Sequence, residues 1–273
     1  MKEKALLAVL LFCLLAGPAA AGEPGGEVVA SGLAAPVGMA HDAQGRLCVA
    51  EWGADRIVRL TERGERAEVI EGIAQPAGLA FDARGTLWAA GYGDGRIYAW
   101  TPQQGLRVVA AGLAAPTGLF WSAETGLLVA NRNAGEVVRI GPDGSREVRS
   151  RGHSFPVGVT RLEDGTLAVS CYGGSVDIVA PDGAVRSFQA TEAGLVRPAV
   201  GILAAGPKSV LVADNGGGTV ARLKVRDGVQ GRAQMVAGGL SSPVGLARAP
   251  DGRILVGSWG EGTVRALAPL PQE

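Results

Sequence analysis

The sequence lacks the features that mark several common classes of protein. Its 26 Lys and Arg residues balance 26 Asp and Glu residues. No block of like charges is present that would bind a nucleic acid or an anionic membrane by sequence-independent electrostatic attraction. It has only three cysteines, and it contains no G-x-S-x-G, H-E-x-x-H or C-x-x-C motif and no phosphate-binding loop. These absences exclude nucleic acid as a partner and leave no standard catalytic or metal-binding motif.

Only one long apolar run occurs, and it lies at the N-terminus. Two lysines precede twelve apolar residues, 5–16, and small residues follow up to Ala21. The run is shorter than the ~20 residues of a membrane-spanning helix and is typical of a signal peptide. We therefore predict a signal peptide over residues 1–21, a single mature domain over residues 22–273, no membrane span, and a periplasmic or secreted location.

Glycine is abundant, with 43 of 273 residues against a usual share of about 7%. Segments beginning at Leu33, Ile73 and Leu113 align without gaps, and more varied copies begin at His153, Leu195 and Leu240. Each copy carries one marker proline, and these are spaced 40, 40, 40, 42 and 45 residues apart: Pro36, Pro76, Pro116, Pro156, Pro198 and Pro243. This period suits a four-stranded propeller blade.

Each copy divides into four short apolar runs, which Gly or Pro interrupts after four to seven residues, so helical repeats are excluded. The second copy predicts strands over 78–81, 86–90, 96–100 and 106–110. The last copy is too short for a fourth strand, whereas residues 28–36 repeat residues 108–116 with one Ser/Ala difference. We predict an all-β, six-bladed β-propeller of four-stranded blades, in which residues 27–31 complete the last blade and close the ring.

The segments Pro36 to Ala40 and Asp42 to Ala50 carry the patterns P-x-G-[LMV]-A and D-x-x-G-x-L-x-V-A. They resemble the NHL-repeat six-bladed propellers and the related gluconolactonase/regucalcin-like superfamily. The resemblance covers residues 27–268 and implies the fold. It leaves the activity open, because this architecture carries hydrolases, lyases, quinoprotein dehydrogenases and binding modules.

Function is expected on the rim formed by the P-x-G segments and the loops after each second strand. The pairs that open these loops differ from copy to copy: Glu51-Trp52, Gly91-Tyr92, Asn131-Arg132, Cys171-Tyr172, Asp214-Asn215 and Ser258-Trp259. An aromatic rim suits stacking on a ligand, although the same rings could instead seal the seams between blades. The predicted ligand-binding residues are Trp52, Tyr92, Asn131, Arg132, Asn133, Tyr172, Asn215 and Trp259.

Two functional hypotheses follow. The first is a monomeric, exported binding scaffold for a protein, peptide or carbohydrate, with no cofactor. The second is a gluconolactonase-like hydrolase or a lyase, in which Glu51, Asp214 and His153 act as acid/base groups or metal ligands and Arg132 stabilises negative charge. Only the second would use a divalent cation. The resemblance argues against an inherited metal site, because the residues that hold the cation in those relatives correspond here to apolar or hydroxyl side chains: Val37, Ala77, Thr117, Val157 and Val244.

Most carboxylates elsewhere have a structural explanation. Six aspartates lie within turns that end in Gly, where the carboxylate accepts local backbone hydrogen bonds: Asp42, Asp82, Asp143, Asp164, Asp182 and Asp251. Cys48 and Cys171 belong to the first and fourth blades, on opposite sides of the ring. A disulfide needs Cα atoms within ~7 Å, so we predict two free thiols.

Overall fold

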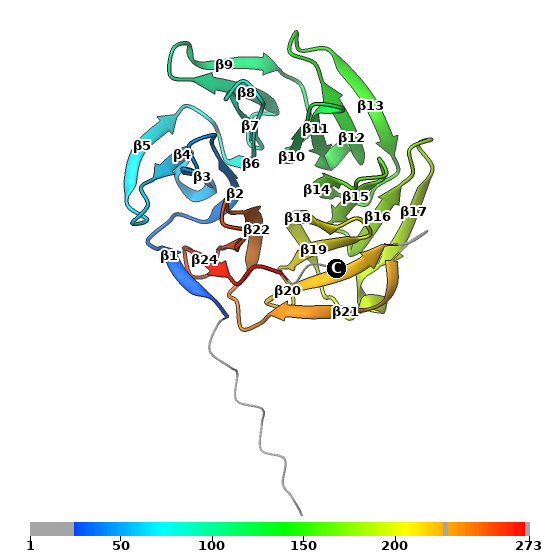
Figure 1. Ribbon diagram of the computed structural model, residues 1–273. Coiled ribbons are helices and arrows are strands. Elements are labelled where there is room, and N and C mark those ends of the chain that lie inside the picture. Colours follow the sequence, from blue (N-terminus) through cyan, green and yellow to red (C-terminus); the bar gives the residue numbers. More distant parts are fainter. Residues whose placement is uncertain (1–24, 226–228, 271–273) are drawn as a thin grey trace, which may run out of the picture.

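The computed structural model describes residues 25–225 and 229–270, so the expected signal peptide lies outside the described residues. Six four-stranded antiparallel sheets surround a central channel as the blades of a propeller (Figure 1). This confirms the predicted fold class. Short 3₁₀ helices follow three of the strands: η1 (Trp52–Ala54), η2 (Arg132–Ala134) and η3 (Ala190–Ala193).

The strands run outward from the channel in chain order within blades 1 to 5. Blade 1 holds β2 (Pro36–His41), β3 (Leu47–Glu51), β4 (Arg56–Leu60) and β5 (Arg66–Glu71); blade 2 holds β6 (Pro76–Phe81), β7 (Leu87–Gly91), β8 (Arg96–Thr101) and β9 (Gly105–Ala110). Blade 3 holds β10 (Pro116–Ser122), β11 (Gly126–Asn131), β12 (Glu136–Ile140) and β13 (Arg146–Arg151); blade 4 holds β14 (Pro156–Arg161), β15 (Leu167–Cys171), β16 (Ser175–Val179) and β17 (Val185–Gln189). Blade 5 holds β18 (Pro198–Gly206), β19 (Ser209–Asp214), β20 (Thr219–Val225) and β21 (Val229–Ala237).

Blade 6 is assembled from both ends of the described chain. Its inner strands are β22 (Pro243–Arg248), β23 (Ile254–Ser258) and β24 (Thr263–Leu267), and its outer strand is β1 (Glu27–Ala30). Glu27 pairs with Ala266 and Val28 with Arg265 in antiparallel register. Strand β1 lies beside β24 in Figure 1. The predicted closure by the N-terminal strand is therefore confirmed, and it joins the ring by backbone hydrogen bonds.

The glycine of each P-x-G segment is explained by how closely the innermost strands approach around the channel. A Cβ atom on Gly38 would lie 2.0 Å from the carbonyl oxygen of Ala77, and one on Gly245 would lie 1.8 Å from that of Val37. Real Cβ atoms do not come this close to backbone atoms. The repeated glycines thus set the diameter of the ring.

Apolar side chains fill the six interfaces between neighbouring blades, and each interface forms a separate cluster of buried residues. Between blades 2 and 3, for example, Ala110 of β9 and Leu113 of the connecting segment belong to the same buried cluster as Val138 of β12. This layered core replaces a single central one, because the channel occupies the middle of the ring.

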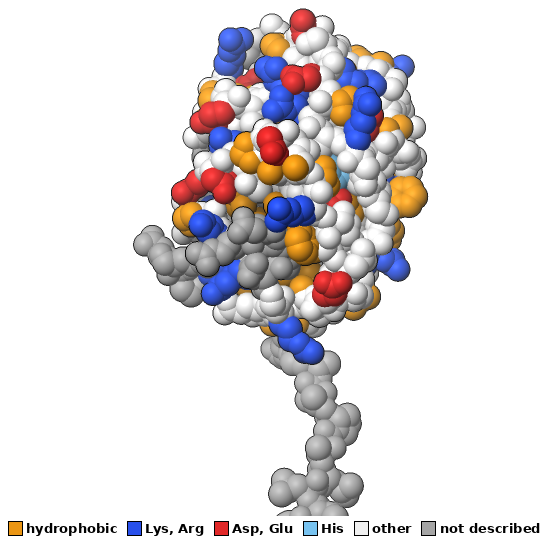
Figure 2. Space-filling view, turned by 90° about the vertical axis from the view of Figure 1, so that its right-hand side faces the viewer, with side chains coloured by type: hydrophobic (Ala, Val, Ile, Leu, Met, Phe, Trp, Pro, Cys, Tyr) orange, Lys and Arg blue, Asp and Glu red, His pale blue; other side chains and the backbone are white. Residues whose placement is uncertain are grey.

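The turns and cysteines behave as predicted. Each of the six turn aspartates accepts a backbone N–H two residues later, as in Asp82 with Arg84 and Asp164 with Thr166, both at 2.9 Å. Cys48 and Cys171 are free and buried. Within the described ranges no helix is long and apolar enough to cross a membrane. On the side of the ring seen in Figure 2, acidic and basic side chains are interspersed.

Candidate functional site: the channel mouth

One face of the ring gathers the six loops that follow the second strands. In every blade the second residue of the predicted rim pair donates its backbone N–H to the carbonyl of the residue before the marker proline, as Trp52 does to Ala35 (3.2 Å) and Tyr172 to Phe155 (2.9 Å). In five blades that acceptor residue has a positive φ, between 47° and 55°, although it is not glycine. In these five blades the uncommon conformation turns the carbonyl toward the loop, and in all six blades the hydrogen bond ties the start of the rim loop to the segment before the marker proline.

These loops enclose a cavity of about 200 Å³ at the channel mouth. Six predicted rim residues line it together, and the side chains of the P-x-G segments form its floor. The wall consists of Trp52, Tyr92, Arg132, Tyr172, Asn215 and Trp259, and the floor of Val37, Ala77, Thr117, Val157, Val200 and Val244. Among the described residues, no carboxylate and no histidine lines this cavity. Its surface is therefore mainly apolar and aromatic, with one amide and one guanidinium.

Three rings from blades 1, 2 and 6 form one side of the mouth. The ring centroid of Trp52 lies 4.4 Å from that of Tyr92 and 5.8 Å from that of Trp259, and both pairs are tilted by about 50°. Trp259 keeps 40% of its surface exposed. Such contacts orient the rings with respect to one another, so this side offers a preformed apolar surface.

Two arginines and two rings from blades 3 to 5 form the opposite side. The guanidinium of Arg132 lies over the rings of Phe155 and Tyr172, 5.0 and 5.5 Å from their centroids. Arg197 lies 5.0 Å from the centroid of Tyr172 and donates to its hydroxyl at 3.1 Å. Phe155 is 49% and Tyr172 39% exposed, so both rings are accessible to a ligand at the mouth.

The first residue of each rim pair has a different place from the second. Glu51, Asn131 and Asp214 are buried, with at most 2% of their surface exposed. Their side-chain oxygens accept backbone N–H groups of the preceding loop, from Ala34 to Glu51 (2.9 Å), from Ala114 to Asn131 (2.8 Å), and from Val196 (2.9 Å) and Arg197 (2.6 Å) to Asp214. These groups hold the loops in place and do not face the cavity. Asn133 also stays outside it, accepting from Arg132 at 2.8 Å.

The carboxylate of Glu51 is further bound by two arginines, Arg56 and Arg66, the latter at 2.8 Å. Burial alone would raise the pKa of Glu51, but the hydrogen bonds from Arg66, Arg56 and the Ala34 backbone outweigh it and lower that pKa. A carboxylate that is kept ionised and fully hydrogen-bonded is poorly suited to act as a general acid or base. The predicted catalytic candidates Glu51 and Asp214 are thus explained by loop structure.

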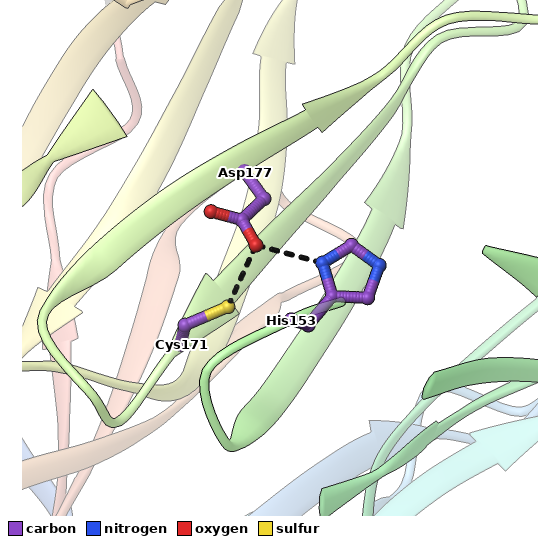
Figure 3. Close-up of side chains that lie close together, drawn as sticks. All are labelled: His153, Cys171 and Asp177. Atoms are coloured by element: carbon purple, nitrogen blue, oxygen red, sulfur yellow. Dashed lines mark hydrogen bonds and ion pairs between the residues drawn. The ribbon is translucent and has the colours of Figure 1, made fainter. Parts of the chain in front are cut away.

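His153, the third acid/base candidate, lies in the interface between blades 3 and 4 and is 5% exposed. Its Nδ1 is 2.7 Å from Oδ2 of Asp177, and its Nε2 is 2.7 Å from the hydroxyl of Ser150. Cys171 donates to the same Oδ2 at 3.3 Å, while Ser175 and Ser187 donate to Oδ1 at 2.8 and 2.7 Å. Figure 3 shows His153, Cys171 and Asp177 pointing toward one another, His153 from the segment between β13 and β14, Cys171 from β15 and Asp177 from β16.

Asp177 was not among the residues predicted from the sequence. Its counterpart in blade 3 is Val138, since Val129 pairs with Val138 and Val169 with Asp177. The sequence did hint at a buried polar partner, because His153 occupies a position that is apolar and buried in the other five copies: Leu33, Ile73, Leu113, Leu195 and Leu240. A histidine at such a position calls for a buried partner. The partner could not be identified without the strand register.

One potential metal-ligating atom from each of His153, Cys171 and Asp177 lies within 4.8 Å of the other two, a spacing that a metal ion would require. Both carboxylate oxygens already accept hydrogen bonds, however, and burial followed by the nearby charge of Asp177 raises the pKa of the Cys171 thiol far above its ordinary value. The pKa of Asp177 is lowered, because hydrogen bonds from His153 and the surrounding donors outweigh burial. The cluster is therefore a mutually satisfied hydrogen-bond network.

Comparison with known proteins supports the fold. No protein family and no curated protein matches the sequence. Among solved structures, the chain resembles virginiamycin B lyase from Staphylococcus aureus with 17% identity and a TM-score of 0.69, covering 87% of this chain and 81% of that one. It resembles a gluconolactonase-family protein with 18% identity and a TM-score of 0.67, covering 92% and 95%.

A third similar structure is the PQQ-bound aldose sugar dehydrogenase from Streptomyces coelicolor, with 17% identity, a TM-score of 0.69 and coverage of 88% and 96%. The names of these three proteins refer to different chemistries on one architecture, so likeness at this level of identity indicates the fold alone. The chain is a six-bladed β-propeller similar in structure to lyases, lactonases and sugar dehydrogenases, which agrees with the resemblance to the gluconolactonase/regucalcin-like superfamily.

Proposed function

We propose that the channel mouth binds a peptide segment of a partner by taking up one apolar or aromatic side chain. The observation that carries this proposal is the set of loop residues that six blades bring to one cavity. Its size, about 200 Å³, suits one large side chain, and its wall combines Trp52, Tyr92 and Trp259 with few polar groups. Burying an aromatic side chain in such a site contributes about 2 to 3 kcal/mol.

A carbohydrate is a weaker candidate for the same site. A sugar presents many hydroxyl groups, and each one that is buried needs a hydrogen-bond partner. The wall offers only Asn215 and Arg132 as side chains with several donors or acceptors. An apolar side chain, by contrast, needs no partner in this cavity.

The test uses two short peptides, acetyl-Gly-Phe-Asn-Gly-amide and the same peptide with Ala in place of Phe, together with cellobiose and maltose. The reporters are the indole N–H signals in NMR spectra of the protein. We expect the Phe peptide to shift the signals of Trp52 and Trp259 and to leave those of Trp88, Trp100 and Trp121 in place. The Ala peptide should bind much more weakly. Peptide binding would be refuted if only a sugar shifted these signals, or if no probe shifted them.

A hydrolase or lyase activity at the same mouth remains the second hypothesis, which the enzymes among the similar structures favour. It lacks support from the site, because Glu51, Asp214 and His153 are engaged elsewhere and only Arg132 of the four candidates lines the cavity. Elemental analysis and thermal melting with calcium, magnesium and zinc would support it if a metal bound and raised the melting temperature.

We also propose that the chain is exported, on the strength of the signal-like residues 1–21. Expression of the full chain in a bacterium, followed by mass spectrometry of the periplasmic and extracellular fractions, should give a protein that begins at Gly22. An uncleaved chain in the cytoplasm would refute export.

A further inference from the structure

The channel mouth has two chemically different sides. The side formed by blades 1, 2 and 6 is aromatic and uncharged, through Trp52, Tyr92 and Trp259. The side formed by blades 3 to 5 presents the guanidinium groups of Arg132 and Arg197 around the exposed ring of Tyr172. A ligand that lies across the mouth therefore meets an apolar surface and a cationic surface next to each other.

Neither guanidinium is neutralised by the protein. Among the described residues, no carboxylate oxygen lies within 4 Å of Arg132 or Arg197, whereas other arginines near the rim loops are paired with Glu or Asp, as Arg56 and Arg66 are with Glu51. The acidic groups on these loops are already engaged, since Glu51 binds Arg56 and Arg66, and Asp214 binds backbone N–H groups. The positive charge of the two arginines therefore remains available to a ligand.

Both arginines are also held in position. The backbone N–H of Arg132 donates to the carbonyl of Ala115. The backbone N–H of Arg197 donates to the carboxylate of Asp214, and its carbonyl accepts from the backbone N–H of Asn215. Their side chains lie over aromatic rings, which restricts their conformations. A guanidinium stacked on a ring still presents its edge, and two N–H groups at that edge match the two oxygens of a carboxylate.

We infer that the bound peptide segment is acidic: its apolar or aromatic side chain enters the cavity, and a carboxylate beside that side chain pairs with Arg132 and Arg197. This inference rests on the proposed peptide binding and specifies which peptide the site selects. The two sides of the mouth then each meet the matching part of one ligand. The partner's segment has the pattern of a large apolar residue next to Asp or Glu.

The experiment compares acetyl-Gly-Phe-Asp-Gly-amide with acetyl-Gly-Phe-Asn-Gly-amide, which differ only in the charge of one side chain. Dissociation constants are measured by NMR titration against the wild-type protein and against the Arg132→Gln/Arg197→Gln variant. Arg107→Gln serves as a matched control, because it removes an exposed positive charge from the outer strand β9. We expect the Asp peptide to bind wild type about tenfold more tightly than the Asn peptide.

This preference should disappear in the double variant, persist in Arg107→Gln, and shrink as salt is raised from 0.05 to about 0.5 M, because exposed charges are screened. Equal binding of the two peptides to wild type would overturn the acidic selection while leaving peptide binding intact. A preference that survives in the double variant would overturn the assignment to these arginines. If neither peptide binds at the mouth, the proposed function itself fails, and the inference with it.

Discussion

The channel mouth and the interface between blades 3 and 4 both depart from the blade repeat, but their polar groups are surrounded differently. At the mouth, Arg132 and Arg197 lie over exposed rings and have no carboxylate partner among the described residues. In the interface, His153 and Asp177 are buried, and their polar atoms are hydrogen-bonded to one another and to serines. A departure from a repeat thus has two physical meanings. Where the protein satisfies its own polar groups the departure is structural, and where it does not, the groups are available to a ligand.

The interface cluster can be compared with blade 3 residue by residue. Four positions that are polar around Asp177 are apolar one blade earlier: Ser150, His153, Asp177 and Ser187 correspond to Ala110, Leu113, Val138 and Val148. The apolar version shows that the fold does not need the network. Burying an aspartate is nevertheless costly unless every donor around it is retained.

Removing the central acceptor should have the largest effect. In Asp177→Ala, the buried side chains of His153 and Ser175 lose their acceptor, as does the exposed Ser187, and we expect the free energy of unfolding to fall by about 3 to 5 kcal/mol. Urea denaturation followed by circular dichroism measures this change. The matched control Val138→Ala removes only apolar contacts and should cost about 1 to 2 kcal/mol. Equal losses in the two variants would show that the network is no more demanding than an apolar interface.

Glu51 tests whether a buried rim carboxylate belongs with the structural or the ligand-facing groups. In Glu51→Ala, the Ala34 backbone and the side chains of Arg56 and Arg66 lose their acceptor, and we expect a loss of about 2 kcal/mol in the free energy of unfolding. Binding of the Phe peptide should change little once the variant is folded. If the Glu51→Ala protein is as stable as wild type but no longer binds the Phe peptide, Glu51 belongs to the binding site.

Converting the network to the pattern of blade 3 should have a smaller effect at neutral pH. The combined variant Ser150→Ala, His153→Leu, Asp177→Val and Ser187→Val should be about as stable as wild type, because removing the buried charge and His153 offsets the loss of an acceptor for the Ser175 hydroxyl and the Cys171 thiol, which remain buried. A loss of more than about 2 kcal/mol in urea denaturation would contradict this expectation.

The same variant should differ from wild type in acid. Since the pKa of Asp177 is lowered in the folded state, its ionised form stabilises the protein above the unfolded value of about 3.9, and this contribution is lost as the pH falls through the folded pKa. Stability measured between pH 7 and about pH 2 should therefore fall less steeply in the combined variant. Some acid sensitivity should remain, because Glu51 also has a lowered pKa.

The arginines of the mouth should show the smallest change in stability. Arg132→Gln removes a partly exposed side chain with no carboxylate partner among the described residues, so we expect the free energy of unfolding to change by less than about 0.5 kcal/mol. The same variant should lose much of the preference for the Asp peptide. A large destabilisation would place Arg132 with the structural groups of the blade interface.

Much of the fold could be predicted from the sequence, because each repeat carries its own turn and strand signals. The four strands predicted in the second copy differ from β6 to β9 by at most two residues at either end. Period and turn chemistry are local properties, and the ring follows from repeating them. The closure by residues 27–31 could also be predicted, since the strand is a recognisable copy of the fourth strand of blade 2.

The candidate site could be predicted only in part. The repeat register was enough to place Trp52, Tyr92, Arg132, Tyr172, Asn215 and Trp259 on one rim. It could not show that Glu51 and Asp214 turn inward to cap the preceding loops, because this depends on side-chain direction within the loop. Nor could it reveal Phe155 and Arg197, each of which directly precedes a marker proline. Phe155 contacts Arg132, and Arg197 contacts Tyr172, only because neighbouring blades pack together.

The closing strand has a consequence for the order in which this protein can be made. Strand β1 leaves the ribosome before any blade exists, yet its partner β24 follows all the strands of blades 1 to 5, and the contact between Arg253 and Glu27 joins residues 226 positions apart. Blades 1 to 5 can form in turn as the chain emerges, whereas blade 6 has to wait until β24 has emerged. Throughout synthesis β1 must remain unpaired without finding a wrong edge, and its four-residue length reduces that hazard.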